Sequence, residues 1–129
     1  MKLFLSYAYA DRGFAAQLRS QIEALGAVFS DRSLQGGDDW RASLRSALEE
    51  ADGVVLVLPT PGSANANSAY FEAGAARALG KKVVAVMPSS ESSRLRELPS
   101  DIYGTAVFDG AHTAPDALAN SIVSALRAA

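Results

Sequence analysis

Five short apolar runs alternate along the chain with segments whose apolar residues recur at helical spacing. The clearest run, residues 53–58, is uninterrupted and rich in β-branched residues, which is typical of a strand covered on both faces. The predicted strands are residues 2–6, 27–30, 53–58, 82–87 and 105–108. Such alternation indicates parallel strands joined by right-handed crossovers. We therefore expect an α/β fold: a flavodoxin-like three-layer sandwich with a five-stranded parallel sheet of order 2-1-3-4-5 and helices on both faces.

Residues with defined roles at helix ends mark the predicted helices. Asp11 is expected to cap the first helix and Gly26 to end it. Thr113 is expected to cap the last helix, with Pro115 in its first turn. A short helix over residues 93–98 is a further prediction.

Length and composition exclude several classes of protein. The 129 residues suit one domain, residues 1–129, and are too few for a (β/α)₈ barrel of about 250 residues. Because the chain has no cysteine and one histidine, His112, it can form no disulfide, thiolate site or multi-histidine metal site, and we expect no metal. A net charge of −2 argues against binding to nucleic acid or to an anionic membrane. The apolar N-terminal run is too short for a signal peptide, so we expect a cytoplasmic protein.

The strand order predicts where a ligand would bind. In open parallel sheets, ligands bind beyond the carboxyl ends of the strands, where strands one and three diverge. Four segments end there: residues 6–10, 31–39, 59–67 and 88–93. Glu72 is expected near the start of the helix after strand three, so that its carboxylate faces this crevice. It is a lone acid among small and apolar residues, and the alternative is an ordinary solvated helix residue.

Familiar ligand motifs are absent from these segments. Neither a G-x-G-x-x-G fingerprint nor a G-x-x-x-x-G-K-[ST] loop is present, and the strand ends lack the acids of a response-regulator receiver. One carboxylate can nevertheless serve the cleavage of a bond between an anomeric carbon and a nitrogen. It can bind the ribose hydroxyls and stabilise or attack the oxocarbenium-like state. Tyr7, Tyr70 and Trp40 are candidates for aromatic walls.

Four motifs, in this order, resemble those of Toll/interleukin-1 receptor (TIR) domains. They are Phe4-Leu5-Ser6-Tyr7 with Asp11; Asp31, Leu34, Gly36-Gly37 and Trp40; Val54 to Leu58 with the Ser/Asn-rich loop after it; and Glu72 with Ala75 and Gly80-Lys81. The resemblance covers residues 1–88, and the last third matches by fold expectation only.

The resemblance implies an NAD⁺ glycohydrolase that releases nicotinamide and yields ADP-ribose or a cyclic isomer, with NAD⁺ as substrate and no cofactor. Glu72 matches the catalytic glutamate, and Ser6 and Tyr7 match the loop that lines the pocket. Ser68 stands where many active members carry a tryptophan, so it is a predicted substrate contact. Further substrate contacts are predicted at the second motif, namely Asp31, Leu34, Gly36, Gly37 and Trp40.

The resemblance also implies partners. Enzymatic TIR domains usually act as assemblies, so residues 31–39 would be both a lid and a self-association surface. The chain would then be an effector of bacterial antiviral defence, and it can be a fragment that normally has a fused or separate sensor module. Two alternatives stay open. One is a TIR module that only self-associates and signals. The other is an enzyme like the nucleoside 2-deoxyribosyltransferases, which share a similar run around Glu72.

Overall fold

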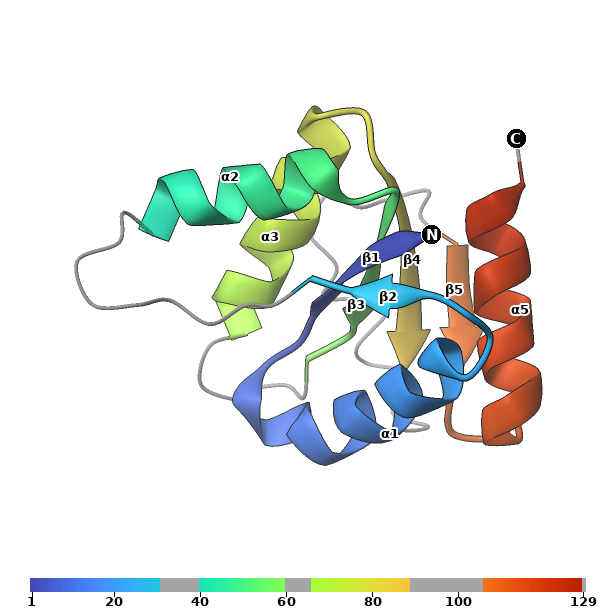
Figure 1. Cartoon of the computed structure of the whole chain (residues 1–129). Coiled ribbons are helices and arrows are strands. Elements are labelled where there is room, and N and C mark those ends of the chain that lie inside the picture. Colours follow the sequence, from blue (N-terminus) through green and yellow to red (C-terminus); the bar gives the residue numbers. More distant parts are fainter. Residues whose placement is uncertain (31–39, 60–65, 89–105, 129) are drawn as a thin grey trace.

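The computed structural model describes residues 1–30, 40–59, 66–88 and 106–128 (Figure 1). The chain forms one sheet in which every pair of neighbouring strands is parallel, in the order β2-β1-β3-β4-β5. The strands are β1 (Lys2–Ser6), β2 (Val28–Phe29), β3 (Gly53–Val57), β4 (Lys82–Met87) and β5 (Ala106–Asp109). The predicted strand order and parallel arrangement are therefore confirmed, and β5 is an edge strand of the sheet.

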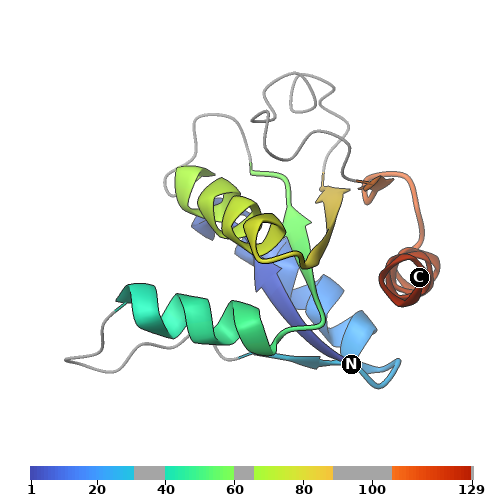
Figure 2. The same ribbon diagram turned by 90° about the horizontal axis from the view of Figure 1, so that it is seen from above.

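The helices cover both faces of this sheet, as the two views in Figures 1 and 2 show. The described helices are the 3₁₀ turn η1 (Tyr9–Asp11), α1 (Arg12–Glu23), α2 (Trp40–Glu50), α3 (Ala66–Ala78) and α5 (Pro115–Arg127). Helices α1 and α5 pack on one face, and α2 and α3 pack on the other. The result is the expected three-layer sandwich.

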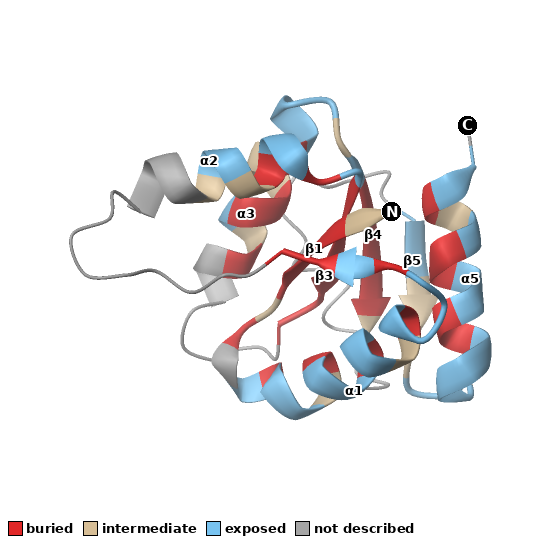
Figure 3. Cartoon of the chain, viewed as in Figure 1, coloured by how far each residue is buried: buried red, intermediate tan, exposed pale blue. Residues whose placement is uncertain are grey.

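The side chains of β1 alternate between the two faces, and this alternation divides the interior into two cores. Leu3 and Leu5 join the core under α1 and α5, whereas Phe4 joins the core under α2 and α3. All five residues of β3 are buried, because helices cover both of its faces (Figure 3). This central position explains why its sequence shows no polar alternation.

Two of the predicted helix caps are wrong. Asp11 occupies the N-cap position of α1, but its side chain makes no capping hydrogen bond. The N-cap of α5 is Ala114 rather than Thr113, while Pro115 does stand in the first turn. Helix α1 ends at Glu23, and Gly26 follows with a positive φ of 94°, a conformation that favours glycine. The predicted helix over residues 93–98 lies outside the described residues.

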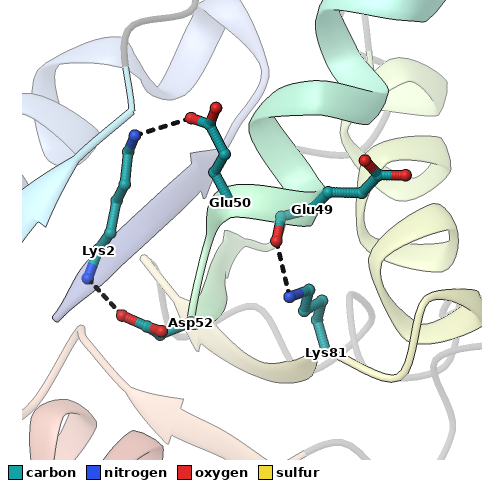
Figure 4. A network of polar contacts seen from close by, with 5 residues as sticks. All are labelled: Lys2, Glu49, Glu50, Asp52 and Lys81. Atoms are coloured by element: carbon teal, nitrogen blue, oxygen red, sulfur yellow. Dashed lines mark hydrogen bonds and ion pairs between the residues drawn. The ribbon is translucent and has the colours of Figure 1, made fainter.

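A small polar network joins β1, α2 and the residue before β4, at the amino ends of the strands (Figure 4). The backbone N–H of Lys2 donates to Asp52 Oδ2 at 2.7 Å, and its Nζ forms an ion pair with Glu50 at 2.9 Å. Lys81 Nζ donates to the backbone oxygen of Glu49 at 2.9 Å. The ion pair with Lys2 lowers the pKa of Glu50, chiefly through its hydrogen bond. These contacts lie at the opposite end of β1 from the predicted site.

Candidate functional site

Glu72 belongs to the buried stripe of α3. Ala69, Ala73 and Ala76 are fully buried against the sheet, and Glu72 lies on the same face because it follows Ala69 by three positions. Its exposed fraction is 4%. A buried carboxylate costs free energy that an apolar side chain at the same place would not. Glu72 is therefore not the solvated helix residue of the alternative interpretation. A role other than solubility must explain why a carboxylate is buried at this position.

The hydroxyl of Ser6 lies against this carboxylate. Ser6 ends β1 and is fully buried, and its Oγ donates to Glu72 Oε1 at 2.9 Å. The same Oγ lies 2.9 Å from the backbone oxygen of Ala69, one turn earlier in α3. The small side chains of the α3 stripe let the helix approach the sheet closely enough for these contacts. The structure thus brings Ser6 and Glu72 together at the carboxyl end of β1, where a ligand was expected.

Two of the aromatic residues proposed as pocket walls, Tyr7 and Tyr70, pack against different cores. Tyr7 is half-buried and packs against the core under α1 and α5, on the face of the sheet opposite Glu72. Tyr70 packs against the core under α2 and α3. Phe71 is 56% exposed and borders a cavity between α2 and α3. The roles of Tyr7 and Tyr70 as pocket walls, and substrate contact by Tyr7, stay predictions.

Several predicted contacts cannot be compared with the structure. Asp31, Leu34, Gly36 and Gly37 lie outside the described residues. Trp40 is the first residue of α2, and Ser68 lies in the first turn of α3, but the side chains of both are outside the described part of the chain. Their roles, and self-association through residues 31–39, stay predictions.

The direct bond between Ser6 and Glu72 was not predicted from the sequence. Ser6 was expected to line the pocket as a substrate contact, yet its side chain is fully buried and engaged with α3. A signal was available, because strand alternation places Ser6 and Tyr7 on opposite faces of the sheet. Only Ser6 could then point toward α3.

Two cavities lined entirely by described residues lie away from Ser6 and Glu72. The larger, about 360 Å³, is a mainly apolar groove between α2 and α3 lined by Leu44, Arg45, Leu48, Phe71, Ala75, Ala78 and Leu79. The smaller, about 120 Å³, lies between α1 and α5. Within the described residues, no three acidic or histidine side chains gather as a metal site would require. No helix in that part of the chain is long and apolar enough to cross a membrane.

His112 lies on the surface of the described structure. Its Nδ1 is 2.8 Å from Oδ2 of Asp109, the last residue of β5, and its side chain is 68% exposed. Asp109 Oδ1 also accepts the backbone N–H groups of Ala111 and His112. The hydrogen bond with the His112 side chain is the main reason that the pKa of Asp109 lies below its usual value. This pair closes the turn after β5 and is separate from the contacts of Glu72.

The sequence matches a family model described as the TIR domain over residues 3–126. No curated protein sequence matches the chain. Among solved structures, the TIR domain of the Toll-related receptor TRR-2 from Hydra magnipapillata has a TM-score of 0.68 at 14% sequence identity, with 98% of each chain covered.

Two other solved structures share the fold. The CMP N-glycosidase BcmB of Clostridium botulinum has a TM-score of 0.57 at 15% identity, covering 96% of this chain and 99% of its own. A flavodoxin-like domain of a Synechococcus sp. protein has a TM-score of 0.56 at 16% identity, and the match covers 98% of this chain and 93% of that domain's chain. At these identities the structural likeness shows the fold alone.

Proposed function

The chain belongs to the TIR domain family, and we propose that it is an NAD⁺ glycohydrolase with Glu72 as its catalytic residue. Members of this family either signal or cleave NAD⁺, so membership alone leaves both functions open. One observation favours cleavage. The buried stripe of α3 contains a carboxylate that is 4% exposed and held at 2.9 Å by Ser6, at the edge of the sheet where ligands of this fold bind.

The proposed reaction breaks the bond between the ribose C1′ atom and the nicotinamide nitrogen. The bonding electron pair passes to the nicotinamide ring and neutralises its positive charge, so the leaving group needs no proton. Glu72 accepts hydrogen bonds from the ribose hydroxyls and stabilises the positive charge that develops on the sugar. A water molecule then bonds to C1′ and loses a proton, which gives ADP-ribose. Attack by another atom of the substrate would give a cyclic isomer instead.

The proposal includes the biological setting that the family resemblance suggests. The protein would act in the cytoplasm as an effector of bacterial antiviral defence. It would be active as an assembly in which residues 31–39 contact a neighbouring copy, under the control of a sensor module. Nucleic acid and membranes are not among the proposed partners.

The decisive experiment follows nicotinamide release from NAD⁺ by chromatography, at protein concentrations high enough to favour self-association. We expect release by the wild-type protein and a loss of at least about a hundredfold in the Glu72→Gln variant, since electrostatic stabilisation of this kind supplies several kcal/mol. Glu23→Gln is the matched control, because Glu23 is an exposed acid on α1. Equal release by wild type and Glu72→Gln would contradict the proposal. Release of free base from CMP or deoxynucleosides, without cleavage of NAD⁺, would favour a nucleoside-modifying enzyme.

A second candidate function is a signalling module that only self-associates. The apolar groove between α2 and α3 favours it, because Phe71 and Leu79 are exposed there by 56% and 37%. Apolar patches of this kind often mark protein contacts. Two results together would favour the signalling function. The wild type would self-associate in sedimentation experiments without cleaving NAD⁺, and Phe71→Ser would prevent the self-association.

A further inference from the structure

The hydroxyl of Ser6 lies between two acceptors on α3. Its Oγ is 2.9 Å from Glu72 Oε1 and 2.9 Å from the backbone oxygen of Ala69. A serine hydroxyl carries one proton, so it can donate fully to only one of these oxygens at a time. It therefore has two orientations, and a hydrogen bond is made in each.

We propose that Ser6 is a positioning residue that holds the Glu72 carboxylate in its working orientation and releases it when substrate takes over the bond. This inference rests on the proposed function of Glu72. The side chain of a glutamate turns about several bonds, so a fixed donor is needed to orient its carboxylate. Ser6 supplies one from a fixed position, because it is fully buried and ends a strand whose residues pair with β3.

The second acceptor explains how the carboxylate can change partners. When a ribose hydroxyl donates to Glu72, the proton of Ser6 turns to the backbone oxygen of Ala69, and no buried polar group loses its partner. A buried donor left without an acceptor would cost about 1–3 kcal/mol, which would oppose substrate binding. Glu72 therefore exchanges one hydrogen bond for another, while Ser6 keeps the first turns of α3 attached to β1.

Ser30 provides a matched control. It is also a buried serine at the carboxyl end of a neighbouring strand, since it directly follows β2. Its Oγ has no hydrogen-bond partner in the described part of the chain. Replacing either serine by alanine removes one buried oxygen and little volume. Only the replacement of Ser6 removes a bond to Glu72.

The first experiment compares steady-state kinetics of NAD⁺ cleavage in the Ser6→Ala and Ser30→Ala variants. We expect kcat of Ser6→Ala to fall about tenfold, the effect of one hydrogen bond to a charged group, with KM changed less than about threefold. Ser30→Ala should keep both constants. A role in folding alone would lower the amount of active enzyme, which is corrected by normalising to the folded fraction. An unchanged kcat in folded Ser6→Ala would overturn the inference.

The second experiment does not depend on activity. The shift of the urea midpoint caused by Ser6→Ala is measured in the wild type and in Glu72→Ala. If Ser6 and Glu72 interact as proposed, the shift is smaller in the Glu72→Ala background, since Ser6 loses only its bond to the neutral backbone oxygen of Ala69 there and no buried carboxylate loses its donor. Equal shifts in both backgrounds would overturn the inference. If the wild type cleaves no NAD⁺ but the shifts differ, the proposed function fails and the contact between Ser6 and Glu72 remains.

Discussion

On one face of the sheet, α1 and α5 bury leucine, isoleucine and valine side chains, whereas on the other face α3 buries three alanines and a glutamate. The large side chains under α5, such as Ile122, exclude much apolar surface from water and contribute mainly to stability. The alanines of α3 contribute less apolar area each, but they let the helix backbone lie close to β1. The comparison teaches that the two faces have different tasks: one supplies stability, and the other supplies the close approach that brings Glu72 to Ser6.

The largest effect on stability is expected on the α5 face. Ile122 is fully buried, so Ile122→Ala should lower the free energy of unfolding by about 2–5 kcal/mol through lost burial and a residual cavity. NAD⁺ cleavage per folded molecule should be unchanged, because the site lies on the other face. Urea denaturation and rates measured under native conditions test both statements. A specific loss of cleavage in the folded variant would contradict the division between the faces.

A smaller loss of stability with a larger loss of function is expected on the α3 face. Ala73→Leu adds volume where Ala73 is fully buried and should cost about 1–3 kcal/mol. It should also reduce cleavage by the folded protein, since α3 is displaced from Ser6. Ala16→Leu is the control, because Ala16 is exposed on α1 and a change there should stay within about 0.5 kcal/mol. Full activity of Ala73→Leu would show that the close approach is not needed.

Removal of the carboxylate itself should separate stability from function. We expect Glu72→Met to abolish cleavage while leaving the free energy of unfolding unchanged or raising it by up to about 2 kcal/mol, because a buried polar group becomes apolar. Ser6 would keep the backbone oxygen of Ala69 as its acceptor. Calorimetry and nicotinamide release measure the two quantities. A clear destabilisation would mean that Glu72 is kept for the fold.

The smallest effect is expected far from both cores, at the turn after β5. The hydrogen bond from His112 lowers the pKa of Asp109 below 3.8, so the ionised carboxylate stabilises the folded state. This contribution is complete above pH 3.8 and is lost as the pH falls through the lowered pKa of the folded state. Asp109→Asn should therefore have a slightly lower urea midpoint than the wild type at neutral pH, and the two should converge in acid. His112→Ala should also converge with the wild type there, and a constant difference at every pH would contradict the linkage.

The sequence was sufficient for the sheet because its apolar runs are continuous and alternate regularly with helices. It also placed Glu72 on the helix after β3, but near the start of that helix, whereas Glu72 lies in the middle of α3. The caps were harder to predict: Asp11 is buried and its side chain makes no capping hydrogen bond to α1, and the N-cap of α5 lies one residue after the expected one. Such details depend on competition between side chains at a helix end. The partnership of Ser6 with Glu72 depends on how closely α3 approaches β1, and strand periodicity alone does not measure that distance.

The contact between Ser6 and Glu72 also has a consequence for the order of folding. It joins residues 66 positions apart, and the pairing of β1 with β3 also spans a long stretch of chain, beginning with Leu3 opposite Gly53. The pairing of β3 with β4 closes a shorter loop, Gly53 to Lys82, and costs less chain entropy. We expect pulse-labelled hydrogen exchange to protect β3 and β4 before β1, and simultaneous protection of all three would contradict this order. A newly made chain would then pass through a compact state that already has part of its sheet but no assembled carboxylate site, so activity would appear only at the last step of folding.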